Sequence, residues 1–199
     1  NLIPRYYDVT KGSVKVDGVD VRDMTQKELR DKLGYVPQKG VLFSGTIDSN
    51  IRYGKPEITD AQVKEAAEVA QATEFIDTKP EKYESPVSQG GTNVSGGQKQ
   101  RLSIARAIAK DPEIFIFDDS FSALDFKTDS QLRKALKEYT KDATTVIVAQ
   151  RISTILGADQ IIVLDDGHMA GIGTHKELMA NCEVYQQIAR SQLSEEELA

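Results

Sequence analysis

A short apolar run near the middle of the chain limits most strongly what this sequence can fold into. Residues 114–117 (IFIF) follow one another without any alternation of polar and apolar side chains. This pattern is typical of a strand that is buried on both faces of a parallel sheet. Asp118 and Asp119 come directly after it. Because ligands bind at the carboxyl ends of strands in open α/β sheets, the sequence predicts an α/β fold with a functional site at this carboxylate pair.

Composition and charge exclude several classes of protein. A chain of 199 residues can bury one good core. No stretch approaches the roughly 18 apolar residues of a membrane-spanning helix. The formal net charge of −6 leaves no basic footprint for nucleic-acid phosphates, so we expect no nucleic-acid partner. Cys182 is the single cysteine and cannot form an intrachain disulfide, which favours a reducing, cytosolic environment.

The first half of the chain predicts a change from mixed to helical structure. Residues 13–21 predict two short strands around a turn at Asp17 and Gly18, followed by a capped helix that begins after Thr25 and a short strand at residues 35–38. From about residue 51 to residue 110 the pattern is helical, with a capping box at Thr59 ahead of residues 63–76. We therefore expect a helical segment inserted into an α/β core.

After Pro112 the alternation of strands and helices returns. The sequence predicts strands at residues 114–117, 144–150, 160–164 and 168–173, with a turn at Asp166 and Gly167 between the last two. Helices are predicted over residues 127–140 and from Thr174 into an acidic C-terminal tail.

Residues 94–112 (VSGGQKQRLSIARAIAKDP) predict a helix with a glycine-rich start. Gly96 and Gly97 let another group approach the backbone closely, and apolar residues then recur at helical spacing until Pro112. Free N–H groups and the helix dipole make such a start an anion site. Taken alone this is weak support, because a glycine-rich helix start is equally compatible with a plain turn.

Four segments together indicate a family. Residues 35–51, 94–112, 114–125 and 146–179 closely resemble, in order and spacing, the nucleotide-binding domain of ABC transporters of the exporter type. The likeness implies a P-loop NTPase-like (RecA-like) α/β core with a predominantly parallel sheet, an inserted α-helical subdomain and a small antiparallel β portion. In this scheme residues 1–50 and 111–199 are the core and residues 51–110 are the helical subdomain. It also implies ATP hydrolysis with Mg²⁺, coupled to transport at the cytoplasmic face of a membrane.

The resemblance implies a role for individual residues. Gln38 matches the Q-loop glutamine, which in the family contacts the magnesium and the attacking water. Asp118 matches the Walker B aspartate, which holds the magnesium through water, and Asp125 matches the D-loop aspartate at the dimer seam. The family's signature motif, which grips the γ-phosphate of a nucleotide held by the opposing domain, is matched by Ser95, Gly96, Gly97 and Gln98.

One departure from the family pattern is the phosphate-binding loop. No G-x-x-x-x-G-K-[ST] occurs in the sequence, although residues 1–12 resemble the helix that follows that loop. The likeness therefore implies a truncated domain that lacks its N-terminal strands and P-loop. By itself such a chain is expected to hold ATP poorly and to be inactive, because the backbone N–H groups and the lysine of the loop are missing.

Two further departures lie at catalytic positions. The family normally has glutamate where Asp119 stands, and the aspartate carboxylate reaches about 1.5 Å less far. A misplacement of that order can cost roughly a hundredfold in rate. The usual histidine of the switch loop is Gln150, which can hydrogen-bond a phosphate but cannot carry the positive charge of an imidazole. Both changes predict a site that binds nucleotide and hydrolyses it slowly.

The intact signature segment then indicates the kind of partner. A homodimer would have two weakened sites, whereas a heterodimer would have one weakened site and one competent site completed by residues 95–98. We therefore expect a non-identical second nucleotide-binding domain, with transmembrane domains, as in multidrug exporters with one degenerate site. The alternatives are a mainly regulatory nucleotide-binding half and a soluble ABC ATPase that acts on DNA or ribosomes.

Simpler roles for the same residues stay open at this point. Asp119 is also compatible with a turn or helix-cap carboxylate, Gln150 with the end of a strand, and Gln38 with an ordinary loop residue. His168 and His175 lack the neighbours that a metal site requires, so we expect them to be solvated or capping residues.

Overall fold

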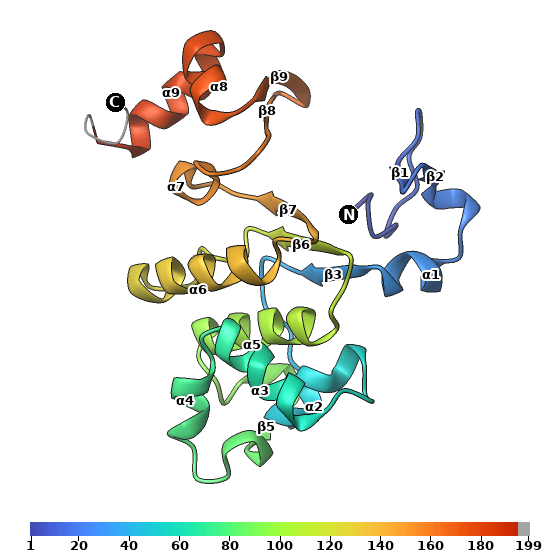
Figure 1. Ribbon diagram of the computed structural model, residues 1–199, viewed down its shortest axis with the longest axis vertical. Helices are drawn as coiled ribbons and strands as arrows, with labels where there is room; N and C mark the ends of the chain where they lie inside the picture. Colours follow the sequence, from blue (N-terminus) through green and yellow to red (C-terminus); the bar gives the residue numbers. More distant parts are fainter. Residues whose placement is uncertain (195–199) are drawn as a thin grey trace. The chain divides into compact units, whose positions relative to one another are not determined.

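The computed structural model describes residues 1–194. The chain divides into two compact units, Asn1–Val146 and Ile147–Ala199, and each is described here by itself. Within the first unit, Figure 1 shows the helices of residues 47–109 below the strands at residues 33–36 and 114–118.

The first unit alternates strands and helices, as expected for an α/β protein. Its strands are β1 (Lys15–Val16), β2 (Val19–Asp20), β3 (Leu33–Val36), β4 (Gly45–Thr46), β5 (Pro86–Val87), β6 (Ile114–Asp118) and the first part of β7 (Thr144–Val148). Its α-helices are α1 (Gln26–Asp31), α2 (Ile47–Ile51), α3 (Asp60–Val69), α4 (Thr73–Asp77), α5 (Gly96–Ala109) and α6 (Phe126–Tyr139). Short 3-10 turns lie at Val21–Asp23, Arg52–Gly54, Lys82–Glu84 and Gln89–Gly91.

The predicted buried strand is confirmed. β6 pairs in parallel with β3, in a register that sets Leu33 opposite Ile114 and Val36 opposite Phe117, and the strand order of this sheet is β3-β6-β7. Phe115 and Phe117 are each 1% exposed. The two short hairpins β1-β2 and β4-β5 are antiparallel, so parallel and antiparallel pairing coexist in the unit.

The helices begin where the sequence predicts and end less predictably. The capping boxes at Thr25 and Thr59 are both formed. The helix expected over residues 63–76 is divided, because α3 ends at Val69 and α4 begins at Thr73. Gln71 lies between them with φ of 56°, a left-handed conformation that a right-handed helix cannot include.

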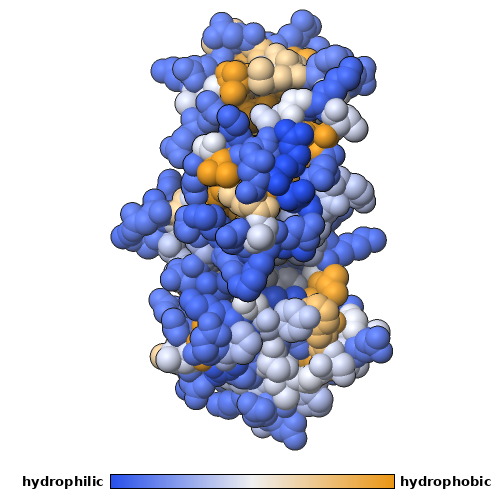
Figure 2. Space-filling view, turned by 90° about the vertical axis from the view of Figure 1, so that its right-hand side faces the viewer, coloured by the Kyte–Doolittle hydropathy of each residue, from blue (hydrophilic) through white to orange (hydrophobic). Residues whose placement is uncertain are grey.

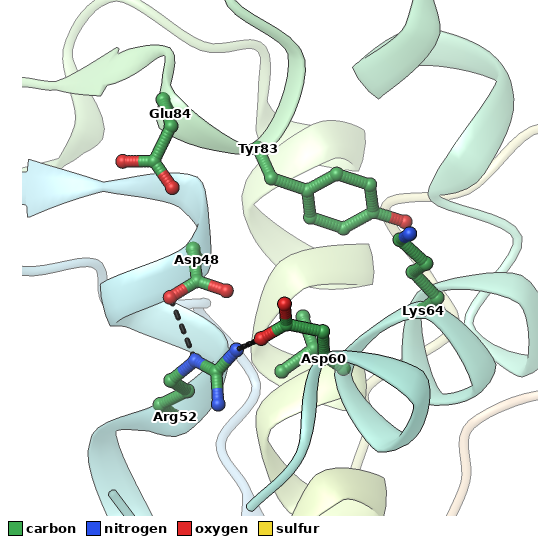
Figure 3. A pocket seen from close by; sticks show the side chains of 7 residues that line it. Asp48, Arg52, Asp60, Lys64, Tyr83 and Glu84 are labelled. Atoms are coloured by element: carbon green, nitrogen blue, oxygen red, sulfur yellow. Dashed lines mark hydrogen bonds and ion pairs between the residues drawn. The ribbon is translucent and has the colours of Figure 1, made fainter.

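An arginine joins α2 to the start of α3. Figure 3 shows Arg52 between Asp48 and Asp60, with a 2.7 Å ion pair from its Nε to Asp48 and a second ion pair to Asp60. Arg52 also donates to the backbone carbonyl of Ile58. These contacts hold the loop between the two helices, because a single guanidinium serves groups on both sides of it.

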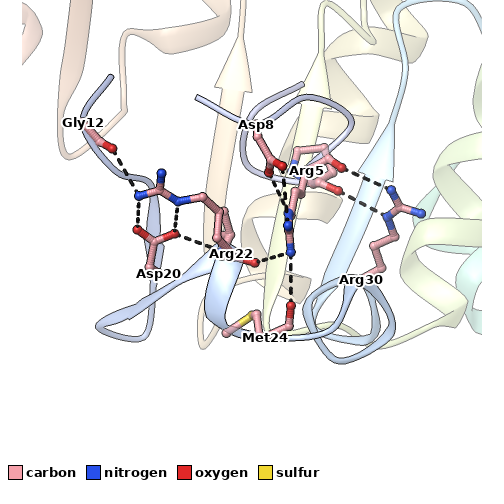
Figure 4. A network of polar contacts seen from close by, with 9 residues as sticks. Arg5, Asp8, Gly12, Asp20, Arg22, Met24 and Arg30 are labelled. Atoms are coloured by element: carbon pink, nitrogen blue, oxygen red, sulfur yellow. Dashed lines mark hydrogen bonds and ion pairs between the residues drawn. The ribbon is translucent and has the colours of Figure 1, made fainter. Parts of the chain in front are cut away.

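The opening residues do not form the helix that the resemblance implied. Residues 2–5 form a turn in which Arg5 N–H donates to the Leu2 carbonyl, and Arg5 has φ of 53°. A left-handed residue stops a right-handed helix, which accounts for the difference. Instead, Figure 4 shows Arg5 donating to the carbonyls of Val21 and Met24, while Arg30 donates to the carbonyls of Pro4 and Arg5.

The second unit contains α7 (Ile152–Ile155), β8 (Ile161–Asp165), β9 (His168–Gly173), α8 (His175–Asn181) and α9 (Glu183–Gln192), after the end of β7. Asp166 and Gly167 turn the antiparallel β8-β9 hairpin with φ of 45° and 77°, as a two-residue hairpin turn requires. The last helix predicted from Thr174 is two helices, because Cys182 is extended between them. The predicted acidic tail falls mostly on residues 195–199, outside the described residues.

No helix among residues 1–194 is both long enough and apolar enough to cross a membrane. The face shown in Figure 2 is largely hydrophilic, with separate hydrophobic areas between polar side chains.

The capping box of α3 provides a stability test. Thr59 Oγ1 accepts from the Gln62 N–H at 3.3 Å, and Gln62 Oε1 accepts from the Thr59 N–H at 2.9 Å. We expect Thr59→Ala to lower the free energy of unfolding by about 0.5–2 kcal/mol, because an N–H of the first turn loses its acceptor. Urea denaturation measures the change. Thr59→Ser keeps the hydroxyl and is the control, so equal losses in the two variants would contradict a capping role.

Candidate functional site

Parallel pairing of β3 and β6 brings two predicted residues together. The loop after β3 contains Gln38, and the turn after β6 contains Asp119, so both lie at the carboxyl edge of the sheet. Gln38 Nε2 donates to Asp119 Oδ2 at 3.1 Å. Asp118 ends β6 beside them, and its Oδ2 accepts from the Tyr35 hydroxyl at 3.1 Å. The edge thus presents two carboxylates and a carboxamide.

The backbone of Asp119 has an uncommon conformation. Its φ is 45°, in the left-handed region. Such conformations in residues other than glycine cluster at functional sites, where neighbouring contacts maintain them. Here the Ser122 hydroxyl donates to the Asp119 carbonyl at 3.0 Å, and the buried Ser120 hydroxyl donates to the Val36 carbonyl at 2.9 Å. Asp119 lies in a turn and is not a helix N-cap, since Asp125 caps α6.

The glycine-rich segment begins α5 as predicted. Ser95 is the N-cap, its Oγ accepts from the Gln98 N–H at 3.2 Å, and Gln98 Oε1 accepts from the Ser95 N–H at 3.1 Å. The two side chains therefore complete a capping box. The N–H groups of Gly96 and Gly97 belong to the first turn, whose N–H groups have no carbonyl partner inside the helix.

Neither glycine is needed for the packing of this chain. A Cβ atom on Gly96 would meet nothing within 4 Å, and a Cβ on Gly97 would meet the Ala123 carbonyl oxygen at an ordinary 3.4 Å. Neither residue has a left-handed φ that would favour glycine. The absence of side chains at both positions thus leaves room for a group that does not belong to residues 1–194.

Asp125 lies near the same helix end. It is the N-cap of α6, and its carboxylate accepts from the Thr128 N–H at 3.0 Å and from the Thr128 hydroxyl at 2.7 Å. These hydrogen bonds lower the pKa of Asp125, so it stays ionised at neutral pH. The turn that leads to it, which includes Ala123, faces Gly97.

Gln150 belongs to the second unit, where it follows β7. Its side chain is exposed, and its carbonyl accepts from Gln192 Nε2 at 2.9 Å. Gln192 Oε1 also accepts from the Ile152 N–H at 2.8 Å. One side chain of α9 therefore holds the backbone on both sides of Arg151, a contact that the sequence does not predict because nothing in the helical pattern distinguishes residue 192.

Sequence reasoning also missed Tyr35 and Gln100, which contact the predicted site residues or the loop that carries them. Burial, and then the hydrogen bond to Asp118, raises the pKa of Tyr35 to about 12. The hydroxyl therefore remains a donor at physiological pH. The sequence signal that could have indicated this role is the position of Tyr35, a polar side chain within the apolar strand β3.

The donors at this edge fit one class of metal ion. Among residues 1–194 no group of three or more His, Cys, Asp or Glu side chains could hold a metal ion. Mg²⁺ is an exception to the need for such a cluster, because it keeps several waters and is usually bound by one or two carboxylates together with substrate phosphates. The oxygen atoms of Asp118 and of the Gln38 amide are of the required kind.

The Tyr35 contact predicts a pH dependence. The folded state raises the pKa from its ordinary 10.0 to about 12, so the stabilisation is fully present below pH 10 and is lost as the pH rises towards 12. We expect the free energy of unfolding to fall over this range in the parent and to fall less steeply in Tyr35→Phe, measured by urea denaturation at each pH. Identical pH profiles would contradict the assignment.

Comparisons with known proteins indicate the family of this chain. The family described as ABC transporter matches residues 1–122. An uncharacterised ABC transporter ATP-binding protein of Mycobacterium tuberculosis is 48% identical over 96% of this chain and 33% of its own length. A Staphylococcus aureus protein named as a putative multidrug export ATP-binding/permease protein is 46% identical over 94% of this chain and 32% of its own length. The chain spans about a third of the length of these relatives.

A solved structure gives the same result for the fold. The structure of a bacterial Atm1-family ABC exporter with ATP bound matches 98% of this chain and 34% of that chain, with a TM-score of 0.93 and 39% sequence identity. The predicted ABC ATPase fold, of the P-loop NTPase type, is confirmed. By its sequence, its fold and the family that matches it, the chain belongs to the ABC transporter family, as an ATP-binding domain of that type.

Proposed function

We propose that the chain is part of the ATP-hydrolysing domain of an ABC exporter, in which ATP-dependent closure of two such domains drives a substrate across a membrane. One observation supports this most directly: Gln38, Asp118 and Asp119 meet at the carboxyl edge of the β3-β6 pair. The S. aureus relative carries the name of a multidrug export protein, and the matched structure is that of an ABC exporter, so both similarities favour export.

Each residue at this edge has a proposed role. Asp118 and the Gln38 amide oxygen would hold Mg²⁺, and Asp119 would orient the attacking water. When bound, Mg²⁺ would neutralise charge on the phosphates of ATP. The carboxylates alone would repel ATP. The 199 residues contain no G-x-x-x-x-G-K-[ST], the loop whose backbone N–H groups and lysine would hold the phosphates of ATP.

The signature segment, residues 95–98, would serve a second site. Its first-turn N–H groups suit a phosphate, and the room left at Gly96 and Gly97 suits a γ-phosphate carried by another domain. Asp125, at the adjoining helix start, would lie at the seam between the two domains. In this arrangement residues 1–50 and 111–199 form the core and residues 51–110 form the helical subdomain that contacts the transmembrane domains, at the cytoplasmic face of the membrane.

Aspartate at position 119 and glutamine at position 150, where the family normally has glutamate and histidine, support an asymmetric assembly. The shorter carboxylate and the uncharged amide weaken the site that this chain contributes, whereas the signature segment is intact. We therefore propose a non-identical partner domain whose competent site is completed by residues 95–98. A mainly regulatory half with little hydrolysis of its own is the second candidate, and the same two substitutions favour it.

Steady-state ATP hydrolysis by the complete protein tests the proposal. We expect low activity when the protein is purified alone and at least tenfold higher activity when it is co-purified with a non-identical transporter half. Full activity alone would replace the heterodimer with a homodimer. No hydrolysis in either preparation, with no ATP binding, would contradict the assignment as an ATPase.

Restoring the common residues at the weakened site should raise turnover. In the complete transporter with the partner's site silenced, we expect Asp119→Glu with Gln150→His to increase the turnover number by on the order of tenfold or more, because the carboxylate regains its reach and the imidazole can carry charge. ATP turnover is the measurement, and the parent with the same silenced partner is the control. Unchanged turnover would count against a degenerate site.

The asymmetric arrangement also predicts that a substitution in the signature segment lowers ATP hydrolysis more than a substitution at Asp119. Gly97→Ala fits this chain without a clash, so we expect an unchanged unfolding transition but a loss of hydrolysis of roughly tenfold or more, since a methyl group enters the space for the partner's nucleotide. We expect Asp119→Asn to cause a smaller loss, because it affects only the weak site. Equal losses of ATPase activity would contradict the asymmetric assembly.

A further inference from the structure

A buried glutamine on α5 contacts the loop that carries Gln38. Gln100 lies two residues beyond the signature segment, and only 1% of it is exposed. A buried carboxamide must find both a donor and an acceptor, because an unpaired polar group in the interior is costly. The partners of Gln100 are therefore informative about what this side chain does.

Both ends of the carboxamide are paired with the same loop. Gln100 Oε1 accepts from the Gly40 N–H at 2.9 Å, and Gln100 Nε2 donates to the Pro37 carbonyl at 3.0 Å. The two backbone groups lie on either side of Gln38 in the sequence. One side chain therefore fixes the loop at both flanks of the residue that contacts Asp119.

The loop also lies directly on the helix. A Cβ atom on Gly40 would come within 2.9 Å of both the Lys99 carbonyl oxygen and Ser103 Oγ. Such a distance is too short for any side chain, so only glycine lets the loop approach α5 this closely. This contact is independent of the Gln100 hydrogen bonds and restricts the same segment.

The start of the loop is held from the other side. The Ser120 hydroxyl donates to the Val36 carbonyl at 2.9 Å, and Ser120 is fully buried. Ser120 directly follows Asp119. The backbone around Gln38 is thus tied both to the turn after β6 and to α5, while the exposed Gln38 side chain extends to Asp119.

We propose that Gln100 is a positioning residue, which holds the loop of residues 37–40 against α5 so that the Gln38 carboxamide is directed at Asp119. In this arrangement the helix that begins at the signature segment and the loop of Gln38 move together. The catalytic consequence rests on the proposed function, whereas the positioning itself is a property of this chain.

The test uses Gln100→Met in the complete transporter, because methionine conserves the volume of the side chain and removes both hydrogen bonds. Ile104→Val is the matched control. Ile104 is fully buried on the same helix, makes no polar contact with the loop, and its shortening lowers stability without releasing residues 37–40.

The first measurement is amide hydrogen exchange followed by mass spectrometry. In Gln100→Met we expect exchange in peptides that cover residues 37–41 to become at least tenfold faster, with exchange in the second half of α5 changed no more than in Ile104→Val. Unchanged exchange at residues 37–41 would overturn the proposal whether or not the protein hydrolyses ATP.

The second measurement separates positioning from general destabilisation. This measurement uses the transporter with the partner's site silenced, so that only the site of this chain turns over. In Gln100→Met we expect kcat for ATP hydrolysis to fall at least tenfold while KM changes less than twofold, and we expect Ile104→Val to retain kcat within twofold. Faster exchange with unchanged kcat would overturn the positioning role. A parent transporter that neither binds nor hydrolyses ATP would contradict the proposed function alone, since the exchange measurement would still decide whether Gln100 holds the loop.

Discussion

The parallel pairing of β3 with β6 is the constraint on which the rest of the candidate site depends. The register sets Val36 opposite Phe117, so the residues that follow both strands emerge at the same edge of the sheet. From this position the Ser120 hydroxyl reaches the Val36 carbonyl, and Gln38 reaches Asp119. A shift of one residue would turn the side chains of β6 to the opposite face and would bury a carboxylate in place of Phe117, which the apolar character of both faces strongly disfavours.

Helix α5 is the second organising element. Its N-terminal end presents N–H groups beside two glycines that need no space within this chain, while Gln100 and the close approach of Gly40 join its next turn to the loop after β3. A helix is a rigid rod on the length scale of one or two turns, so the glycine-rich start of α5 and the loop after β3 are mechanically linked. In the proposed assembly, this connection would be a physical route by which the occupancy of one nucleotide site affects the other.

Local signals predicted most of the elements. Strands β3 and β6, the β8-β9 hairpin and the capped starts of α1 and α3 follow from apolar runs, turn residues and capping boxes, which act over a few neighbouring residues. Two of the errors have a common cause, whereas the helix predicted from Thr174 is divided by an extended residue, Cys182. Arg5 and Gln71 adopt left-handed conformations that end helical turns, and neither is a glycine whose identity would announce it. Tertiary contacts maintain such residues, so the residue type gives no warning.

The sequence by itself determined the α/β class, the family, and the two carboxylates at the end of a buried strand, because these depend on residue type and on short-range spacing. Only the tertiary structure decided that Gln38 pairs with Asp119, 81 residues away, and that Gln100 holds the loop between Pro37 and Gly40. A glutamine on a helix gives no sign of its partner. Partners so distant in sequence are selected by strand register and by the requirement that buried polar groups be paired, and both conditions are met only once the whole unit has packed.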